Sequence, residues 1–374
     1  MEEYIYKDNK KLRYGYTTGS CAAAASKAAA MMLLTKIRQE NIFLMTPKGI
    51  GLNLKVENIQ INDEEVTCGI IKDAGDDADC TDGILVLATV RATDNNEIII
   101  TGGKGVGRVT KPGLEQPVGE AAINRVPRQM IKEAVSDVIE TCSFSGGMHI
   151  EISVPKGEEI GARTFNPRLG IEGGISILGT SGIVEPMSEQ ALVATIHTEM
   201  KQKAHGGVKN ILVTPGNYGR DFAKKEFGID LDMGIKCSNF IGETIDMAYE
   251  FQLEKILLIG HIGKLVKVAA GIMNTHSRWA DGRMEVLCAG AVMAGAQTDL
   301  CKKILECITT DDALQLLFDN NLLEKTMQYV MKKIYENLNR RAYEGLTVDV
   351  IVFSNVFGVL GMTNKAEKLL DHFR

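Results

Sequence analysis

Two loops of this chain carry residues whose types and spacing could support chemistry. The first, TGGKGVGRVTKPG (101–113), holds five glycines and follows a predicted strand. Glycines let backbone amides approach an anion closely. The loop lacks the Gly-Lys-Ser/Thr ending of a P-loop, and no helix clearly opens after its G-x-G-x-G spacing. It therefore predicts either an anion-contacting loop or a glycine hairpin that binds no ligand.

The second loop is rich in aspartate. KDAGDDADCTDG (72–83) places five aspartates in twelve residues. Carboxylates this close could hold Mg²⁺, but the bidentate Glu that closes an EF-hand loop is missing. The pattern favours a solvated turn or a ligand-contacting loop over a dedicated metal site, so we expect no protein-bound metal. Asp73 is a candidate catalytic residue.

Histidine and cysteine offer few further groups. His261 lies at a predicted strand end within GHIGK (260–264), which is the best position for a ligand contact or a catalytic role. His276 is a second candidate. Either could instead be a hydrogen-bonded structural residue. The eight cysteines form no CxxC motif. Cys21, beside a predicted helix start, is a conceivable nucleophile, although a buried, inert thiol is the favoured interpretation.

Two segments with little or no charge could also contact a ligand. Thr17, Thr18 and Ser20 precede a helix expected over 21–34, where their hydroxyls can cap the helix and its N-terminus suits an anion. The glycine-rich segment 164–188 is long, and long loops without their own secondary structure tend to be functional. It is expected either to line the site or to connect two domains.

Short strand-like runs in the first part of the chain predict a mixed α+β domain over residues 1–155. The runs cover 42–45, 52–61, 66–71, 84–90, 97–100 and 148–154, and a helix is expected over 121–141. Residues 156–188 form an interdomain glycine-rich segment in this interpretation.

The later part of the chain has a different pattern, with strands and helices in alternation. It predicts a Rossmann-like α/β domain over 189–374 with a parallel sheet and a helical C-terminal part. Strands are expected at 211–214, 255–260 and 348–354, and helices at 240–251, 264–272 and through 285–337. Parallel sheets bind ligands beyond the carboxyl ends of their strands, where PGNYG (215–219) and GHIGK fall.

Composition limits the function classes. A chain of 374 residues favours two domains over one. Its net charge of −6 argues against general nucleic-acid binding. The N-terminus lacks the apolar core of a signal peptide, and no stretch approaches the roughly 20 apolar residues of a membrane span. The cysteines are typical of a reducing compartment. We therefore expect a cytoplasmic enzyme with no membrane partner; whether it forms a homo-oligomer stays open.

Seven blocks, in order along the chain up to about Glu285, closely resemble the cobalt-precorrin-5B carbon-1 methyltransferase family of anaerobic cobalamin biosynthesis, the CbiD family. The blocks are LRYGYTTGSCAAAASKAA (12–29), IKDAGDDADCTDG (71–83), GGKGVGRVTKPGL (102–114), AINRVPRQM (122–130), TFNPRLGIEGGISILGTSGIVEPMS (164–188), KCSNFIGE (236–243) and GHIGKLVKVAAGIMNTHS (260–277). The strict glycine fingerprint of common methyltransferases does not appear among them.

The resemblance implies a C-methyltransferase that moves a methyl group from S-adenosylmethionine to carbon 1 of cobalt-precorrin-5B, giving cobalt-precorrin-6A. S-adenosylmethionine is the expected cofactor, and the substrate is a cobalt-containing tetrapyrrole. From the strand-end loops we expect cofactor contacts at Gly216, Asn217, Gly219, Gly260, His261 and Gly263.

The corrin precursor carries several carboxylates, which are ionised near neutral pH. Residues 101–130 hold five basic residues against two acidic ones, and arginine forks suit carboxylates. Scattered surface charge is the alternative. The expected substrate contacts are Lys104, Arg108, Lys111, Arg125, Arg128, Arg163 and Arg168, together with Thr17, Thr18 and Ser20.

Two other functions remain open. A Mg²⁺-dependent phosphotransferase would use the aspartate loop for metal and GGKGVGR for phosphate. A non-catalytic tetrapyrrole-binding protein would bind the macrocycle without transferring a methyl group.

Overall fold

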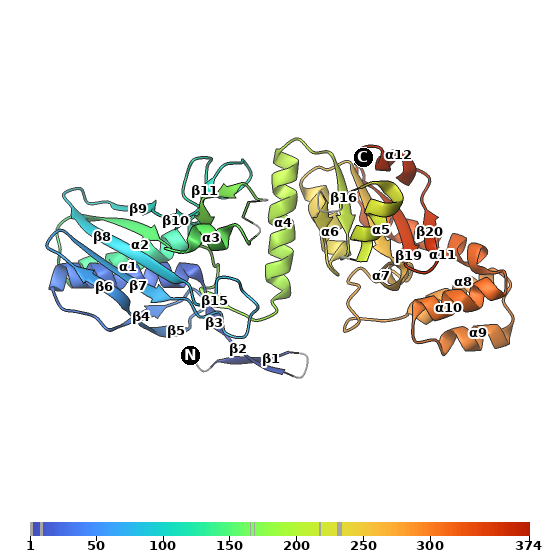
Figure 1. Cartoon of the computed structure of the whole chain (residues 1–374), viewed down its shortest axis with the longest axis horizontal. Coiled ribbons are helices and arrows are strands. Elements are labelled where there is room, and N and C mark those ends of the chain that lie inside the picture. Colours follow the sequence, from blue (N-terminus) through green and yellow to red (C-terminus); the bar gives the residue numbers. More distant parts are fainter. Residues whose placement is uncertain (1–2, 8–9, 165, 168, 217, 230–233) are drawn as a thin grey trace. The chain divides into compact units, whose positions relative to one another are not determined.

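The computed structural model describes residues 3–7, 10–164, 166–167, 169–216, 218–229 and 234–374 (Figure 1). The chain forms two compact units, Met1–Glu189 and Gln190–Arg374. Asn217 and Arg168, two residues nominated from the sequence, lie outside the described residues.

The first unit is built on a mixed sheet with the strand order β6-β7-β8-β12-β9. Neighbouring strands are antiparallel except β12 and β9, which are parallel. Side chains alternate between buried and more exposed positions along β8 and β12, so one face of the sheet is buried. The strands are β6 (Glu57–Ile61), β7 (Glu65–Ile71), β8 (Leu85–Thr93), β9 (Ile98–Gly102) and β12 (Gly147–Ser153).

Helices α1 (Thr18–Thr35) and α2 (Arg125–Thr141) pack against each other and cover the buried face of this sheet (Figure 1). Helix α1 is buried on nearly all sides, including its alanines from Ala22 to Ala25. Small side chains allow this helix to approach both the sheet and α2 closely. The alanine run therefore serves packing.

Short paired strands complete the first unit. Hairpins form from β1 (Tyr4–Lys7) with β2 (Lys10–Arg13), and from β4 (Asn41–Met45) with β5 (Gly51–Lys55). The remaining pairs are β3 (Gly15–Tyr16) with β15 (Ile183–Val184), β10 (Gly105–Val106) with β14 (Gly174–Ile175), and β11 (Arg108–Val109) with β13 (Ile171–Glu172), beside α3 (Gly157–Gly161). Residues 156–188 thus lie within the first unit rather than between two units.

The second unit holds a sheet with the order β17-β16-β18-β19-β20. All neighbours are parallel except β19 and β20, which are antiparallel. The strands are β16 (Asn210–Thr214), β17 (Ile235–Lys236), β18 (Lys255–His261), β19 (Thr347–Ser354) and β20 (Gly358–Met362).

Both faces of this sheet are covered by helices. Ile256 and Leu258 of β18 join one apolar cluster, whereas Leu257 and Ile259 join another on the opposite face. Alternate residues of a strand point to opposite faces, so the continuous apolar run KILLIG is what a parallel strand buried on both sides requires. The helices from Glu189 onward, not all of which touch the sheet, are α4 (Glu189–His205), α5 (Tyr218–Phe227), α6 (Ile241–Glu250), α7 (Ile262–Val268), α8 (Arg283–Met293), α9 (Thr298–Leu305), α10 (Thr310–Asp319), α11 (Leu323–Arg341) and α12 (Ala366–Leu370).

The mixed α/β class and the central pairings expected from the sequence are confirmed. Strands 211–214 and 255–260 pair in parallel, and the strand at 348–354 joins the same sheet beside β18. Several expected elements differ in extent: the helix expected over 21–34 begins at Thr18, and the one expected over 121–141 begins at Arg125. The run 52–61 is two strands, because β5 pairs with β4 and β6 with β7. The helix expected over 264–272 ends at Val268. No helix of the described residues is long and apolar enough to cross a membrane.

Candidate functional site

The carboxyl ends of the parallel strands in the second unit meet at one edge of the sheet. Numbered in chain order, the strands are arranged 2-1-3-4-5. In doubly wound sheets with this order, ligands bind at the switch point between the first and third strands. Here those strands are β16 and β18; Pro215 follows β16, and His261 is the last residue of β18.

His261 ends β18 and caps helix α7. Its Nδ1 accepts a hydrogen bond from the Gly263 amide at 3.1 Å. This bond assigns the ring proton of the neutral form to Nε2. The ring is half-buried and packs edge-on against Phe353, with centroids 5.5 Å apart. Burial lowers the pKa of His261, against an opposing effect of Asp311. The neutral ring therefore offers an N–H donor, and its only lone pair is already engaged.

Lys264 links the strand-end loops. Its Nζ donates to the carbonyl oxygens of Pro215 at 2.5 Å and Ser238 at 3.4 Å. Burial lowers the pKa of this ammonium group. The side chain thus ties together the loops after β16, β17 and β18.

Ser354 and Asp311 stand at the end of the next strand. Ser354 Oγ donates to Asp311 Oδ1 at 2.8 Å and accepts from the amides of Val356 and Phe357. Asp311 comes from the first turn of α10. The edge therefore combines a neutral imidazole, an ammonium group and a carboxylate from separate segments of the second unit.

The glycines predicted to contact a cofactor differ in their surroundings. A Cβ added at Gly216 would have only Lys264 Nζ, at 3.7 Å, within 4 Å among the described residues beyond its chain neighbours. A Cβ at Gly260 would lie 2.9 Å from side-chain atoms of Leu265 and Pro215, so this glycine serves packing. Gly219 lies within α5. Of the glycines compared, Gly216 thus has the fewest described atoms around the position of a Cβ.

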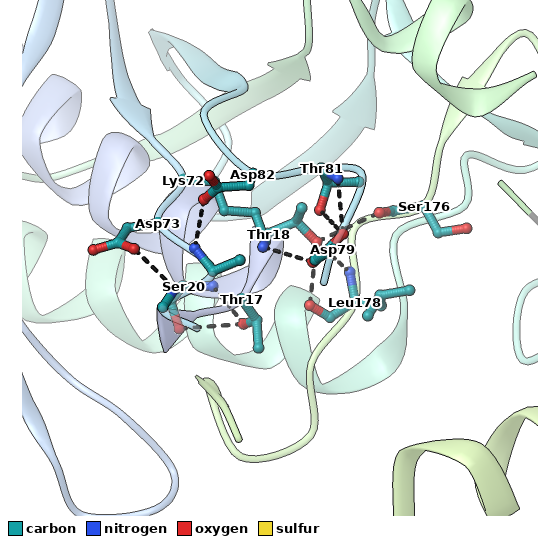
Figure 2. A network of polar contacts seen from close by, with 12 residues as sticks. Thr17, Thr18, Ser20, Lys72, Asp73, Asp79, Thr81, Asp82, Ser176 and Leu178 are labelled. Atoms are coloured by element: carbon teal, nitrogen blue, oxygen red, sulfur yellow. Dashed lines mark hydrogen bonds and ion pairs between the residues drawn. The ribbon is translucent and has the colours of Figure 1, made fainter. Parts of the chain in front are cut away.

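The hydroxyls at the start of α1 in the first unit are bonded within the protein (Figure 2). Thr17 Oγ1 accepts from the Ser20 amide, and Ser20 Oγ donates to the Gly182 carbonyl at 2.6 Å. Thr18 Oγ1 accepts from the Leu178 amide at 2.9 Å. All three side chains are buried. These bonds fasten segment 176–182 to the helix, and substrate contact by the three residues stays a prediction.

The aspartates of loop 72–83 also have partners within the protein. Lys72, which is only 2% exposed, forms an ion pair with Asp79 at 2.7 Å (Figure 2). Asp82 Oδ1 accepts from the Ala74 amide at 2.8 Å. Backbone amides of Arg13 and Met187 donate to Asp76 and Asp77. Among the described residues, no group of three or more potential ligands is arranged to hold a metal ion.

Asp73 is held by Arg13 in a two-pronged ion pair with distances of 2.5 and 2.7 Å. The Arg13 guanidinium is the main reason that the pKa of Asp73 lies below its ordinary value. A lowered pKa makes a carboxylate a weaker proton acceptor. The ion pair thus makes Asp73 a weaker base, and its catalytic role stays a prediction.

The glycine-rich loop is occupied by close backbone packing. A Cβ added at Gly105 would lie 1.9 Å from the Val154 carbonyl oxygen, and one at Gly157 would lie 2.0 Å from the Gly105 carbonyl oxygen. Gly174 approaches Gly105 just as closely, at 2.2 Å. These glycines let three backbone segments touch. Their spacing has a structural cause without any bound anion.

The predicted carboxylate-binding residues divide by their contacts. Arg128 donates to the carbonyls of Ile123 and Ile100, and Arg163 pairs with Glu159 at 2.6 Å. Arg108 is exposed and donates once, to the Gly119 carbonyl. The side chains of three others are exposed and have no ion-pair partner within the part of the chain that the structure describes. They are Lys104, Lys111 and Arg125.

Two residues flagged in the sequence take the structural alternative. His276 Nδ1 accepts from the Arg278 amide at 3.1 Å. Cys21 is fully buried, which raises the pKa of its thiol to about 12. Sequence reasoning also missed Lys264 as a site residue, although it lies inside the quoted motif GHIGK. The missing information was that Lys264 lies in helix α7 with its Nζ bonded to the loops after β16 and β17. Only the folded structure shows this.

Comparisons with known proteins all indicate the same family. The family model described as CbiD matches residues 5–186, and the one described as "CbiD, C-terminal domain" matches 274–364. A relative from Ruminiclostridium cellulolyticum named cobalt-precorrin-5B C(1)-methyltransferase is 53% identical over 95% of this chain and 92% of its own length. One of the same name from Alkaliphilus metalliredigens is 48% identical over 99% of this chain and 97% of its own.

A solved structure is also similar. It is described as the cobalamin biosynthesis protein cbiD from Archaeoglobus fulgidus, is 28% identical, and covers 74% of this chain and 86% of its own, with a TM-score of 0.40. The sequence relatives carry the conclusion, since they match nearly the whole chain at identities far above chance. The chain belongs to the CbiD family.

Proposed function

We propose that this protein transfers a methyl group from S-adenosylmethionine to carbon 1 of cobalt-precorrin-5B, giving cobalt-precorrin-6A and S-adenosylhomocysteine. The observation that carries the proposal is the name shared by relatives 40–53% identical over at least 95% of this chain. The reaction belongs to cobalamin biosynthesis. A cytoplasmic setting is part of the proposal, and the free state of the cysteines among the described residues supports a reducing compartment.

The reaction depends more on the alignment of the two reactants than on a strong general acid or base. Carbon 1 attacks the methyl carbon in line, a C–C bond forms, and the C–S bond breaks with its electron pair moving to sulfur. The macrocycle then loses one proton, so its net gain is one methylene unit. Holding two reactants in this geometry supplies much of the acceleration. This fits the candidate residues, because Asp73 is a weakened base and the Nδ1 lone pair of His261 is engaged.

The cofactor is assigned to the carboxyl edge of the second unit's sheet, which we regard as Rossmann-like in its parallel part. Support comes from the switch point between β16 and β18, where this class of sheet binds nucleotide-like ligands. His261 would offer its Nε2–H to an acceptor on the ligand. Loops 215–219 and 260–264 would provide the surrounding backbone groups.

The carboxylates of the tetrapyrrole are assigned to the basic residues of the first unit that have donors to spare. These are Lys104, Lys111 and Arg125, with Arg108, whose guanidinium uses one bond to the Gly119 carbonyl. Arg128 and Arg163 are already engaged, so they contribute less. Ionised carboxylates and guanidinium forks match in charge and shape.

A single-turnover experiment tests the proposal. Excess protein is mixed with cobalt-precorrin-5B and methyl-labelled S-adenosylmethionine. The label should move to the macrocycle, whose mass should rise by one methylene unit. A macrocycle that binds but gains no label would favour the non-catalytic carrier instead. Stabilisation by Mg²⁺-ATP and not by S-adenosylmethionine in a thermal-shift assay would favour the phosphotransferase.

A further inference from the structure

The Lys264 ammonium group has donor capacity left over. An ammonium group has three N–H donors. Lys264 uses two toward carbonyl oxygens, those of Pro215 and Ser238. The second of these bonds is long, at 3.4 Å. At least one donor therefore has no partner within the described part of the chain.

The positive charge of Lys264 is also uncompensated among the described residues. Among acidic groups, the Cys237 thiol has the strongest electrostatic effect on Lys264. Burial raises the pKa of that thiol to about 12, so the thiol is neutral at pH 7. Asp311 on the same edge is bonded to Ser354. A half-buried cation surrounded by neutral dipoles is costly, and a bound anion would offset that cost.

The ammonium group lies near Gly216, the second residue after β16. Beyond its chain neighbours, Gly216 has only Lys264 Nζ near the position of a Cβ, at 3.7 Å, among described atoms. A side chain at this position would occupy the space in front of the ammonium. Because residue 216 is a glycine, its own side chain does not occupy that position.

We propose that Lys264 binds a carboxylate of the reacting pair, namely the carboxylate on the methionine part of S-adenosylmethionine. This assignment rests on the proposed placement of the cofactor at this edge. A carboxylate near Gly216 would take the unused donor of Lys264 and neutralise its charge. The carbonyls of Pro215 and Ser238 hold the ammonium in place for that contact.

Calorimetry with two ligands tests the inference. S-adenosylhomocysteine carries the carboxylate, and 5′-methylthioadenosine has the same adenosine and thioether but no amino-acid group. In Lys264→Met, affinity for S-adenosylhomocysteine should fall about tenfold or more, the effect of losing a charged hydrogen bond. Affinity for 5′-methylthioadenosine should stay unchanged. Lys264→Gln, which keeps a hydrogen-bond donor, provides a second variant in case Lys264→Met fails to fold.

Lys255→Met is the matched control, because Lys255 begins β18 and so lies at the end of that strand away from α7 and Lys264. It should bind both ligands as the unaltered protein does. An equal loss for both ligands in the Lys264 variants would mean that Lys264 only ties the loops, which overturns the inference. Unchanged S-adenosylhomocysteine affinity with a raised KM for cobalt-precorrin-5B would move the contact to the tetrapyrrole and equally overturn it. If the unaltered protein bound neither ligand, the proposed function itself would fail.

Discussion

The polar loops of the first unit and the strand edge of the second unit use their polar groups differently. In the first unit, the aspartate loop and the start of α1 are bonded to the protein itself, as in the Lys72–Asp79 pair. At the edge of the second unit, His261 and Lys264 retain donors. The aspartates, which look most chemical in the sequence, thus have partners within the protein itself. The less conspicuous motif GHIGK carries the groups that remain available.

The largest expected effect concerns the glycine packing of the first unit. Gly105→Ala should lower the free energy of unfolding by about 3 kcal/mol or more, because the new Cβ would overlap the Val154 carbonyl in a left-handed backbone. Gly173→Ala is the matched control, since its φ of +77° is close to the +74° of Gly105 but nothing lies within 4 Å of its Cβ. It should cost about 1 kcal/mol. If urea denaturation gave the same loss of unfolding free energy for both variants, the close packing at Gly105 would contribute nothing to stability.

The buried ion pair comes next. Lys72→Met should lower the free energy of unfolding by about 3 kcal/mol, because it leaves the largely buried Asp79 without its charged partner. Arg163→Ala removes an ion pair whose side chains are 70% and 63% exposed, and it should cost about 0.5 kcal/mol or less. Chemical denaturation compares the two. A Lys72 variant as stable as the Arg163 variant would remove the structural role of the aspartate loop.

Substrate recognition should separate free from engaged arginines. Arg108→Ala should lower kcat/KM for the tetrapyrrole by about tenfold, because a charged hydrogen bond to a carboxylate is lost. Arg163→Ala should have a smaller effect, since its guanidinium is held by Glu159. The KM for S-adenosylmethionine should stay unchanged in both. Equal kinetics for Arg108→Ala and the unaltered protein would exclude Arg108 from the carboxylate-binding residues.

The smallest effect is in acid stability. The Arg13 guanidinium lowers the pKa of Asp73, so the carboxylate stabilises the folded state above the ordinary aspartate pKa of about 4. That contribution is lost as pH falls through the lowered value. Because the pair is partly exposed, it amounts to less than about 1 kcal/mol. The free energy of unfolding, measured between about pH 5 and pH 2, should fall more steeply as pH decreases for the unaltered protein than for Asp73→Asn. Parallel curves would contradict the pairing.

Much of the second unit could be predicted from sequence, because continuous apolar runs such as KILLIG are diagnostic of strands buried on both faces. Their parallel pairing followed from the intervening helices. The place of residues 164–188 could not be predicted, since its two-residue strands pair with partners such as Gly105 and Tyr16, far away in the chain. Periodicity carries no information on such contacts.

Among the site residues, sequence composition located the charges but not their partners. Arg108 and Arg128 look equivalent in the sequence, yet Arg128 bonds to two backbone carbonyls and Arg108 to one. Likewise, Asp73 looks like a base until Arg13 is seen beside it. Contacts between residues far apart in the chain decide which charged side chains already have partners within the protein. Local sequence patterns carry no information on those contacts.

The account rests on the second unit's edge holding the cofactor while the aspartate loop of the first unit serves structure. Calorimetric titration of S-adenosylhomocysteine into His261→Asn and Asp73→Asn tests this directly. Asparagine can still cap α7, so His261→Asn removes mainly the Nε2–H donor. We predict about tenfold weaker binding for His261→Asn and unchanged binding for Asp73→Asn. Unchanged affinity in His261→Asn together with a loss in Asp73→Asn would contradict the account and move the cofactor to the first unit.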